Sequence, residues 1–354
     1  MKGNMLTFLV LLVTLVCTFG VGCQPKKITD DSSTASDRYL YIQSGGCYAP
    51  TGLTASTASK TVSRINLTTG VVDRTVADYT SALTDTPVAI APYDDDNLYV
   101  LVENTGGRRI EILNKKTSLS TNFLINTTAL SGVVRTLTLG SDGSFLISRS
   151  AAVERFASNK ARLPNSTTAF LSAPAGTCAT TTNAITATAF TSAGDILYAH
   201  SFTGASTNNR IGMTTGSTSA ASTCYNGVAA PTTASYPTAM IYLPDLKHLL
   251  VAYSSSTAAN NQVWQYTVDE SAHTITAAGA AAYTNTAVIN GPTAMAYDST
   301  TGYVYIANGT TAFANSIEKF TYDSTAKTLT RVGTVAFSSP TINHNCINSM
   351  FVGK

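Results

Sequence analysis

Histidines are the side chains in this sequence best suited to acid–base or metal chemistry, and the chain has four of them. They are His200, His248, His273 and His344, and none lies within four residues of another. Protein metal sites use ligands at short, regular spacings such as Cys-x-x-Cys or His-x-x-x-His, and no such pair occurs. We therefore expect no metal site and no cofactor. His200 ends an expected strand and His344 precedes one, so both are candidates for the mouth of a binding site.

Motifs for nucleophilic or phosphoryl chemistry are also missing from the sequence. It contains no Gly-x-Ser-x-Gly nucleophile motif and no glycine-rich phosphate-binding pattern. The acidic run Asp94-Asp95-Asp96 lacks the alternating ligand spacing and the later Glu of a calcium-binding EF-hand loop. We interpret it as a solvated turn, and the motifs favour a protein that is not an enzyme.

Asparagine and arginine side chains recur in loops at corresponding places along the chain, a pattern that suits hydrogen-bonded recognition. Together with nearby residues they form a candidate ligand-binding set: Arg108, Arg109, Asn183, Asn208, Asn260, Asn290, His344 and Asn345. Such polar groups suit a polar ligand, a glycan or a protein. The alternative is that each Asn caps its own turn by bonding nearby backbone. Whether these side chains form one surface depends on the elements that carry them.

An internal repeat defines those elements. Residues 291–333 read GPTAMAYDSTTGYVYIANGTTAFANSIEKFTYDSTAKTLTRVG, and residues 236–279 repeat the Pro-Thr-Ala-Met start, the apolar strand and the Ser/Thr/Asn loop. Weaker copies occupy 86–126, 132–158 and 183–213. In the clearest copy, turn residues and alternating apolar residues predict strands at 292–297, 303–308, 316–322 and 328–335. Four strands in about 50 residues are typical of a β-propeller blade.

The two ends of the repeat region predict how the ring closes. YLYIQS at 39–44 matches the second strand of a blade, and CINSMFV at 346–352 matches the first. The C-terminal strand would then complete the blade begun at the N-terminus and remove an exposed sheet edge. We therefore predict an all-β fold, a six-bladed β-propeller over residues 38–354. Its topology would place the loops after the second strands and the connections between blades on one face.

One repeat also carries a family resemblance. The unit YVYIANGTTAFANSIEKFTYDSTAKTLTRVG at 303–333, with its hairpin near Asp323, resembles the repeat of the YVTN/lactonase-like bacterial β-propellers. Members of that group typically have seven blades, whereas this sequence predicts six. The resemblance implies an alternative function as a lactonase-like hydrolase, with His344, Arg149 and Glu103 at the channel mouth.

The N-terminal residues predict export and a lipid anchor. Lys2 and the apolar run at 5–16 predict a signal peptide over residues 1–22, because the run is too short to span a bilayer. Gly20-Val21-Gly22-Cys23 resembles the lipobox of bacterial lipoproteins, in which Cys23 would be lipidated. The lipidated Cys and a polar, flexible tether would cover 23–37. The alternative is an ordinary secretory signal with an incidental Cys.

Gln24 bears on the location of the anchored protein. An Asp after the lipidated Cys would resemble an inner-membrane retention signal, so Gln24 favours the outer membrane of a bacterial cell envelope. Whether the propeller would face the periplasm or the exterior stays open.

Four cysteines, Cys47, Cys178, Cys224 and Cys346, remain once the signal is removed and Cys23 is lipidated. An even number in an exported chain favours disulfides. In the predicted closing blade, Cys346 starts one strand and Cys47 follows its antiparallel neighbour, so we expect a Cys47–Cys346 bridge that locks the ring. Cys178 and Cys224 would pair by exclusion. Free buried thiols are the alternative.

Composition limits the class of partner. Charged residues make up 12% of the chain and the formal net charge is +2, which excludes the clustered basic excess of a nucleic-acid binder. The 35 Ser and 57 Thr make about a quarter of the sequence and predict a neutral, hydroxyl-rich surface. We expect an envelope lipoprotein that binds or scaffolds a protein or glycan partner. A surface adhesin is a further alternative to the hydrolase.

Overall fold

The computed structural model describes the greater part of the predicted propeller. It covers residues 37–45, 60–80, 85–104, 107–125, 133–149, 152–163, 170–172, 183–202, 209–215, 220–221, 227–229, 231, 235–309, 316–335 and 347–354. Outside these lie Cys23, Cys47, Cys178, Cys224 and Cys346, together with Asn208, His344 and Asn345. The signal peptide, the lipid, the tether and both disulfides therefore stay predictions. No helix within the described residues is long and apolar enough to cross a membrane.

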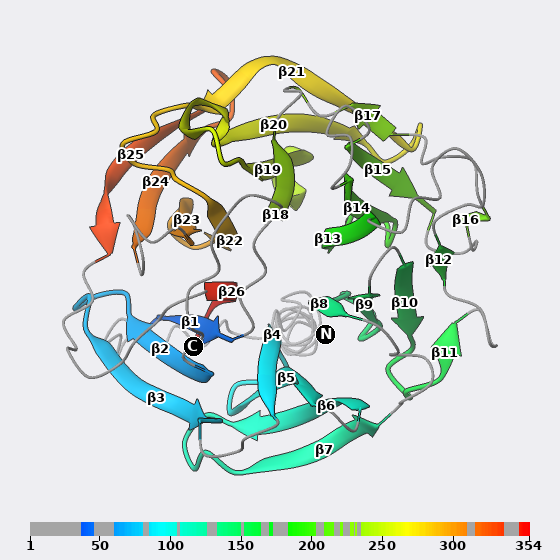
Figure 1. Cartoon of the computed structure of the whole chain (residues 1–354), viewed down its shortest axis with the longest axis vertical. Helices are drawn as coiled ribbons and strands as arrows, with labels where there is room; N and C mark the ends of the chain where they lie inside the picture. The colour runs from blue at the N-terminus through cyan, green and yellow to red at the C-terminus, as the bar shows by residue number, and fades with distance from the viewer. Residues whose placement is uncertain are drawn as a thin grey trace, which may run out of the picture. The chain divides into compact units, whose positions relative to one another are not determined.

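Six sheets are arranged around a common axis, one for each predicted blade (Figure 1). From the axis outwards, the first blade contains β26 (Ile347–Gly353), β1 (Tyr39–Ser44), β2 (Thr61–Asn66) and β3 (Val72–Asp78). The second contains β4 (Thr86–Pro92), β5 (Asn97–Asn104), β6 (Gly107–Asn114) and β7 (Ser120–Ile125). The third contains β8 (Val134–Leu139), β9 (Phe145–Arg149) and β10 (Ala152–Phe156), with the short β11 (Arg162–Leu163), β12 (Leu171–Ser172) and β16 (Ala220–Ala221) outside them.

The last three blades follow the same order. The fourth contains β13 (Asn183–Phe190), β14 (Ile196–Phe202), β15 (Arg210–Thr214) and β17 (Gly227–Ala229). The fifth contains β18 (Tyr236–Leu243), β19 (His248–Ser254), β20 (Gln262–Asp269) and β21 (Thr274–Tyr283), with single 3₁₀ turns at Pro244–Leu246 and Ala258–Asn260. The sixth contains β22 (Pro292–Asp298), β23 (Tyr303–Asn308), β24 (Ile317–Asp323) and β25 (Thr328–Val335). The six-bladed all-β fold predicted from the repeats is thereby confirmed.

The predicted ring closure is confirmed as well. Strand β26 pairs antiparallel with β1, which places Tyr41 opposite Phe351. Their rings stack with centroids 4.9 Å apart, and the Tyr41 hydroxyl donates to the Lys354 carbonyl at 2.8 Å. The C-terminus is thus joined to the N-terminal strand of the same sheet, so that blade is completed by both ends of the chain.

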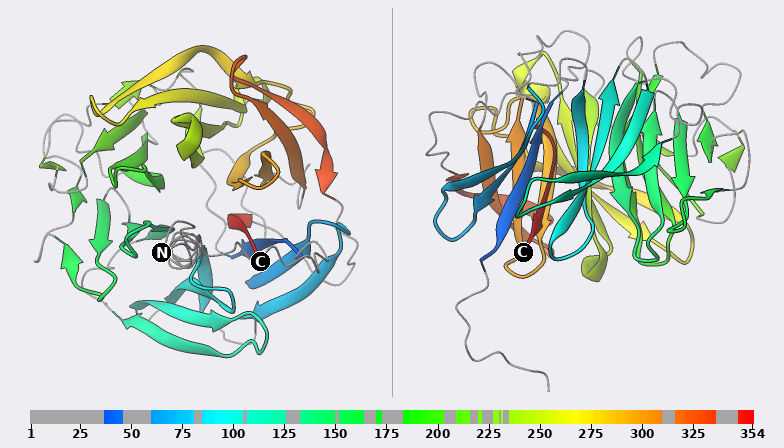
Figure 2. Two further views of the ribbon diagram at one scale, coloured as in Figure 1. Left: turned by 180° about the vertical axis from the view of Figure 1, so that it is seen from behind. Right: turned by 90° about the horizontal axis from the view of Figure 1, so that it is seen from below.

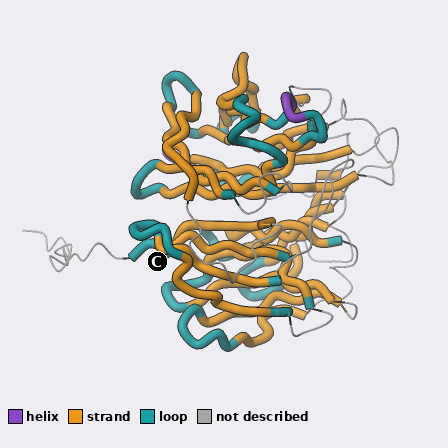
Figure 3. The backbone as a smooth tube through the Cα atoms, turned by 60° about the vertical axis from the view of Figure 1, so that its left-hand side comes forward, coloured by secondary structure: helices purple, strands orange, loops and turns teal. Residues whose placement is uncertain are grey.

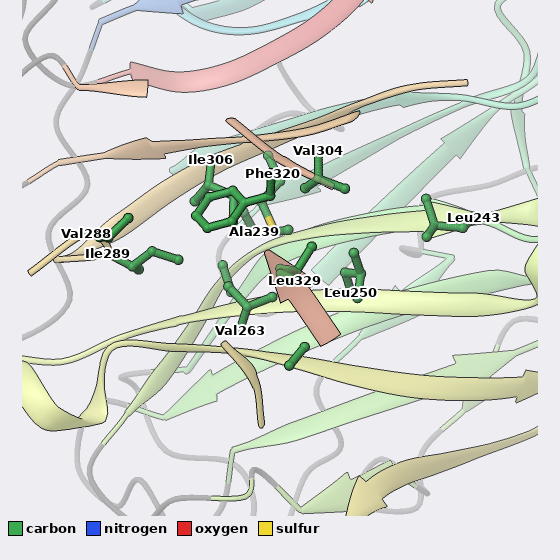
Figure 4. Close-up of a cluster of buried hydrophobic side chains, with 13 residues drawn as sticks. Ala239, Leu243, Leu250, Val263, Val288, Ile289, Val304, Ile306, Phe320 and Leu329 are labelled. Carbon is green, nitrogen blue, oxygen red and sulfur yellow. The ribbon is translucent and has the colours of Figure 1, made fainter. Parts of the chain in front are cut away.

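Apolar side chains fill the spaces between neighbouring blades. Between the fifth and sixth blades, Phe320 is fully buried in a cluster with Leu250, Val263, Ile306 and Leu329 (Figure 4). Strand side chains alternate between the two faces of a sheet, so each blade presents one apolar row to each neighbour. This packing holds the innermost strands in a fixed ring.

The strands run between two rims of the ring, and the loops lie at their ends (Figures 2 and 3). We call the upper rim the end at which the innermost strands begin and the second strands finish. The pairs Thr86–Glu103, Pro292–Asn308 and Ile347–Ser44 lie at this end of their blades. The upper rim therefore carries the connections between blades together with the loops after the second strands.

Candidate ligand-binding site

Each innermost strand has one β-bulge near its upper end. In every case the pairing with the second strand skips one residue, as between Pro237 and Ala239 in the fifth blade. The skipped residues, which we call the bulge ring, are Val88, Arg135, Thr186, Thr238, Thr293 and Asn348. A bulge turns a side chain out of the regular alternation of its strand. Here it does so once per blade, at the same level of the ring.

All six residues of the bulge ring line one pocket, which we call the rim pocket. Its volume is about 240 Å³, and Thr86, Glu103, Val133 and Val134 complete the described part of its wall. The pocket is therefore built from six segments far apart in the sequence. Convergence of all blades on one small cavity is the feature of this ring that best fits a ligand site.

The rim pocket opens towards the central channel. Arg135, Thr186, Thr238, Thr293 and Asn348 also line the channel, whose volume is about 630 Å³. The remaining channel wall is mostly small or apolar, with Ala, Met, Leu and Ile side chains of the innermost strands. The bulge ring is thus a polar collar between the upper rim and a more apolar channel.

Three threonines of the bulge ring bridge neighbouring blades. The hydroxyl groups of Thr186, Thr238 and Thr293 donate to the carbonyl oxygens of Pro237, Pro292 and Ile347, each at 2.6 Å. Each bond links one innermost strand to the next. Because these bonds occupy the hydroxyl hydrogens, the threonine oxygens face the pocket as hydrogen-bond acceptors.

Two ionisable side chains are present among the described residues of the pocket wall, Arg135 and Glu103. Glu103 forms a salt bridge with Arg108, which stands opposite it on β6. The negative charge of Glu103 is therefore matched by a cation on its own blade. Arg135 adds a further positive charge where the pocket meets the channel.

Arg109, predicted to bind ligand, takes part in a polar network that links the second blade to Tyr79, the residue after β3. It bonds Asp85 at 2.6 Å and Glu111 at 2.7 Å. The Tyr79 hydroxyl donates to the second oxygen of Glu111 at 2.9 Å. The bond from Arg109 holds the pKa of Asp85 below its usual value, and burial followed by the Glu111 charge raises the pKa of Tyr79. The guanidinium of Arg109 thus bonds two carboxylates of its own blade.

The three residues of the hydrolase alternative are not assembled by the described chain. Arg149 bonds Glu154 at 2.6 Å, and that carboxylate is fully buried on the neighbouring strand β10. Glu103 lies on the second blade, not on the third with Arg149, and is paired with Arg108. His344 lies outside the described residues. Of the described candidates for binding or catalysis, only Glu103 lines the rim pocket.

Asn290 makes local structural bonds at the upper rim. Asn290 donates its backbone N–H to the side chain of Asn308 at 2.9 Å, and its side chain accepts from Asn261 at 3.2 Å. Asn260 ends the 3₁₀ turn Ala258–Asn260, and Asn183 begins β13. For Asn290, these bonds match the alternative in which asparagine caps the loops.

The described histidines lie away from the pocket wall. His200 is fully buried on β14, where burial, followed by the charge of Arg210, lowers its pKa to about 3. It was a candidate for the upper mouth, and the structure places its side chain in the interior. His248 contacts the Tyr322 hydroxyl at 2.8 Å, and His273 contacts Asp195 at 2.9 Å.

The acidic run in the second blade forms a turn, as expected. The Asp94 carboxylate accepts the backbone N–H groups of Asp96 and Asn97 at 2.8 and 2.7 Å. Lys116 forms an exposed ion pair with Asp96 at 2.6 Å. The carboxylates thus organise the turn through local bonds.

The bulge ring was missed by the sequence analysis, although a signal for it exists. Thr238 and Thr293 are the Thr of the repeated Pro-Thr-Ala-Met motif. Aligning the six copies on that motif places Val88, Arg135 and Asn348 at the same position. The signal is a single column of the repeat, which becomes meaningful only when all six copies converge on one axis.

Comparisons with known proteins support the architecture. No protein-family profile matches the chain, and no curated protein sequence is significantly similar to it. A structure of a nidogen–laminin complex matches with a TM-score of 0.55 and 10% identity, covering 90% of this chain and 98% of that one. A protein of unknown function from Bacteroides caccae matches with a TM-score of 0.55 and 12% identity, covering 90% and 99%.

A lactonase is among the similar structures. The periplasmic gluconolactonase of Pseudomonas aeruginosa matches with a TM-score of 0.51 and 12% identity, covering 89% of this chain and 99% of that one. At these identities the similarity concerns the fold alone. The chain is a six-bladed β-propeller that resembles lactonase-like bacterial propellers at low identity.

Proposed function

We propose that this protein is an envelope lipoprotein whose propeller binds a small polar ligand, or the polar end group of a glycan or protein partner, in the rim pocket. The observation that carries the proposal is the bulge ring, in which six blades each direct one side chain into the same cavity. Three of these residues also bridge neighbouring blades, whereas Val88, Arg135 and Asn348 place other side chains in the same cavity. Bulges next to binding sites are a common way to redirect a side chain.

The size of the pocket supports a small ligand. A cavity of about 240 Å³ lies below the 300–1,000 Å³ typical of sites for drug-sized molecules. Any larger partner would therefore insert only an end group, while its remaining surface would contact the loops of the upper rim. The low charge of the chain favours recognition by hydrogen bonds over electrostatic capture of a large charged surface.

Filling the pocket tests the proposal. Thr238→Phe places a ring in the cavity, whereas Thr330→Phe places one on the exposed outer strand β25 as a matched control. Crosslinking in intact cells, followed by purification and mass spectrometry, would identify bound molecules for wild type and both variants. We expect one species to be recovered with wild type and Thr330→Phe and lost with Thr238→Phe.

One outcome would contradict the proposal. Recovery of the same species in equal amount from a folded Thr238→Phe protein would show that the rim pocket is not the binding site. Circular dichroism and Tm would establish that both variants are folded.

A further inference from the structure

We propose that the lower rim of the first and second blades docks on the surface of the lipid bilayer that holds the protein's anchor. The lower rim is the end at which β1 begins and the innermost strands finish, opposite the upper rim. This inference rests on the lipid anchor of the proposed function and adds the face of the propeller that meets the membrane. It follows from exposed apolar side chains, from a comparison of corresponding turns, and from the place where the first strand begins.

Exposed apolar side chains lie in three turns at this rim. Val71 and Tyr93 are each 44% exposed, and Leu119 is 71% exposed. They occupy the turns before β3, β5 and β7 respectively. The other large apolar side chains that are exposed in the described chain lie on three different blades: Val133, Leu246 and Val332. The first and second blades thus present three apolar groups at one end, whereas no other blade presents more than one in its described residues.

Two of these side chains stand at corresponding positions of one kind of turn. In the turns 66–71, 114–119, 269–274 and 323–328, the first side chain is Asn or Asp and accepts two backbone N–H groups of the turn. The fifth residue of each turn has a φ between 52° and 70°. The exposed sixth residue is Val71 or Leu119 in the first two blades, but Thr274 or Thr328 in the fifth and sixth. The same turn therefore forms with a polar residue at this position, so the turn does not require Val71 or Leu119 to be apolar.

The turn 66–71 lies directly beside the first residues of the propeller. Leu67 donates its backbone N–H to the Arg38 carbonyl at 2.8 Å. The predicted tether, which joins Arg38 to Cys23, would span at most about 50 Å when extended and about 20 Å on average as a flexible chain. A lipid on Cys23 would therefore hold this rim close to the bilayer surface.

The turns of the second blade are joined to the first blade at the same rim. The Lys115 ammonium donates to the carbonyl oxygens of Asp94 and Lys354, at 3.2 and 3.0 Å. Lys354 follows β26, so this one side chain connects two turns of the second blade to the end of the first blade. The two blades are neighbours in the ring (Figure 1). The three apolar side chains are thus carried by one connected set of turns.

The chemistry of these side chains suits the interface of a bilayer. Val and Leu side chains gain by leaving water for the acyl region, and Tyr, with an apolar ring and a polar hydroxyl, is enriched at membrane interfaces. The acidic run 94–96 lies beside Lys115 and Lys116, so we expect docking to depend little on anionic lipid. Three side chains bind a bilayer weakly by themselves, but a lipid anchor makes the contact intramolecular and so raises its effective concentration.

Quenching of tryptophan fluorescence by brominated lipid tests the inference. The full lipidated chain would be reconstituted in phosphatidylcholine vesicles with and without bromine on the acyl chains. Leu119→Trp places a reporter in the proposed surface, and Thr328→Trp places one at the corresponding position of the sixth blade as a matched control. Wild type, whose single tryptophan is Trp264 in the fifth blade, gives the background signal.

We expect the reporter fluorescence of Leu119→Trp to fall at least about twofold in brominated vesicles, because a side chain at the boundary of headgroups and acyl chains reaches the bromine atoms. Thr328→Trp should add no quenching to the wild-type background. Val71→Trp should behave like Leu119→Trp and supplies the reading if Leu119→Trp does not fold. Adding phosphatidylglycerol to the vesicles should leave these differences unchanged.

Two results would overturn the inference. The first is equal quenching of Leu119→Trp and Thr328→Trp. The second is a wild-type dimer in detergent that Leu119→Ser dissociates, which would assign the surface to a second copy of the chain. Analytical ultracentrifugation would detect that dimer.

Mass spectrometry of the same samples separates failure of docking from failure of the proposed function. Protein without an acyl group on Cys23 would refute the anchor and, with it, docking. Acylated protein that shows equal quenching would refute docking alone. Ligand binding in the rim pocket is tested separately by Thr238→Phe.

Discussion

Replacing Thr238 by Val removes one hydroxyl from the bulge ring and changes the shape of the side chain little. In wild type this hydroxyl lies 2.6 Å from the Pro292 carbonyl and 3.3 Å from the Ala252 carbonyl. Pro292 is buried, so its carbonyl oxygen would be left without this donor. A hydrogen bond contributes about 1 kcal/mol net, and a buried acceptor left unpaired costs about 1–3 kcal/mol.

We therefore expect Thr238→Val to lower the free energy of unfolding by about 1–2 kcal/mol. For a propeller of this length that corresponds to a decrease in Tm of about 1–3 °C. Thr293→Val should have a similar effect, because Thr293 makes the same bond to the Ile347 carbonyl in the next blade. The half-buried position of Thr238 beside the pocket keeps the expected loss at the lower end of the range for buried groups.

Differential scanning calorimetry and urea denaturation would measure both changes, with Thr330→Val as the control. Thr330 lies exposed on the outermost strand β25, where Val should change stability by less than about 0.5 kcal/mol. Thr238→Val and Thr293→Val proteins as stable as Thr330→Val would refute the role of these hydroxyls as bridges between blades.

Three further predictions concern other parts of the chain. The folded-state pKa of His200 is about 3, below the ordinary 6.5, so the unfolded chain binds the extra proton between these values. Stability should therefore fall as pH drops from about 6.5 towards 3, by at most about 1.4 kcal/mol per pH unit, and His200→Gln should flatten this dependence in urea titrations. Phe320→Ala should lower the free energy of unfolding by about 3–5 kcal/mol, because it leaves a cavity in a packed cluster. Val332→Ala, at an exposed position, should change that free energy little in the same urea titrations. Equal effects of the two variants would contradict the packing described. Cys23→Ser should abolish incorporation of labelled palmitate and release the protein from the membrane fraction, and labelling that persists would rule out Cys23 as the lipid site.

Much of the scaffold could be predicted because the repeat carries it in several copies. In the sixth blade the predicted strands 303–308 and 328–335 coincide with β23 and β25, and the other two differ by one residue at one or both ends. Asp-Ser-Thr turns and alternating apolar residues set these limits locally. The closing pair of β26 and β1 was also predictable, since each end of the chain matches a different strand of the same repeat.

The candidate site was less predictable, for two physical reasons. The Asn and Arg residues of the upper rim are polar and recur in loops, but for Arg109 and Asn290 the bonds lie within the scaffold. Composition and position do not distinguish a donor aimed at a ligand from one aimed at a neighbouring loop. The bulges are harder still to predict from the sequence. One extra residue in a strand changes the face on which a side chain lies, but it does not change the residue types around it.

In a repeat protein, the copies can be compared with one another at each position, which a fold without repeats does not allow. When six copies share a position, the most frequent residue indicates which bond the scaffold makes there, and a different residue can stand where another side chain makes that bond. Thr is common in the bulge ring because it bridges blades, as Thr186 does to the Pro237 carbonyl. Arg135 departs from Thr in a blade where Thr138 and Thr188 form the bridge instead. A long, charged side chain is costly to hold beside an apolar channel. At this place the repeat therefore holds a charged side chain that lines both the rim pocket and the channel.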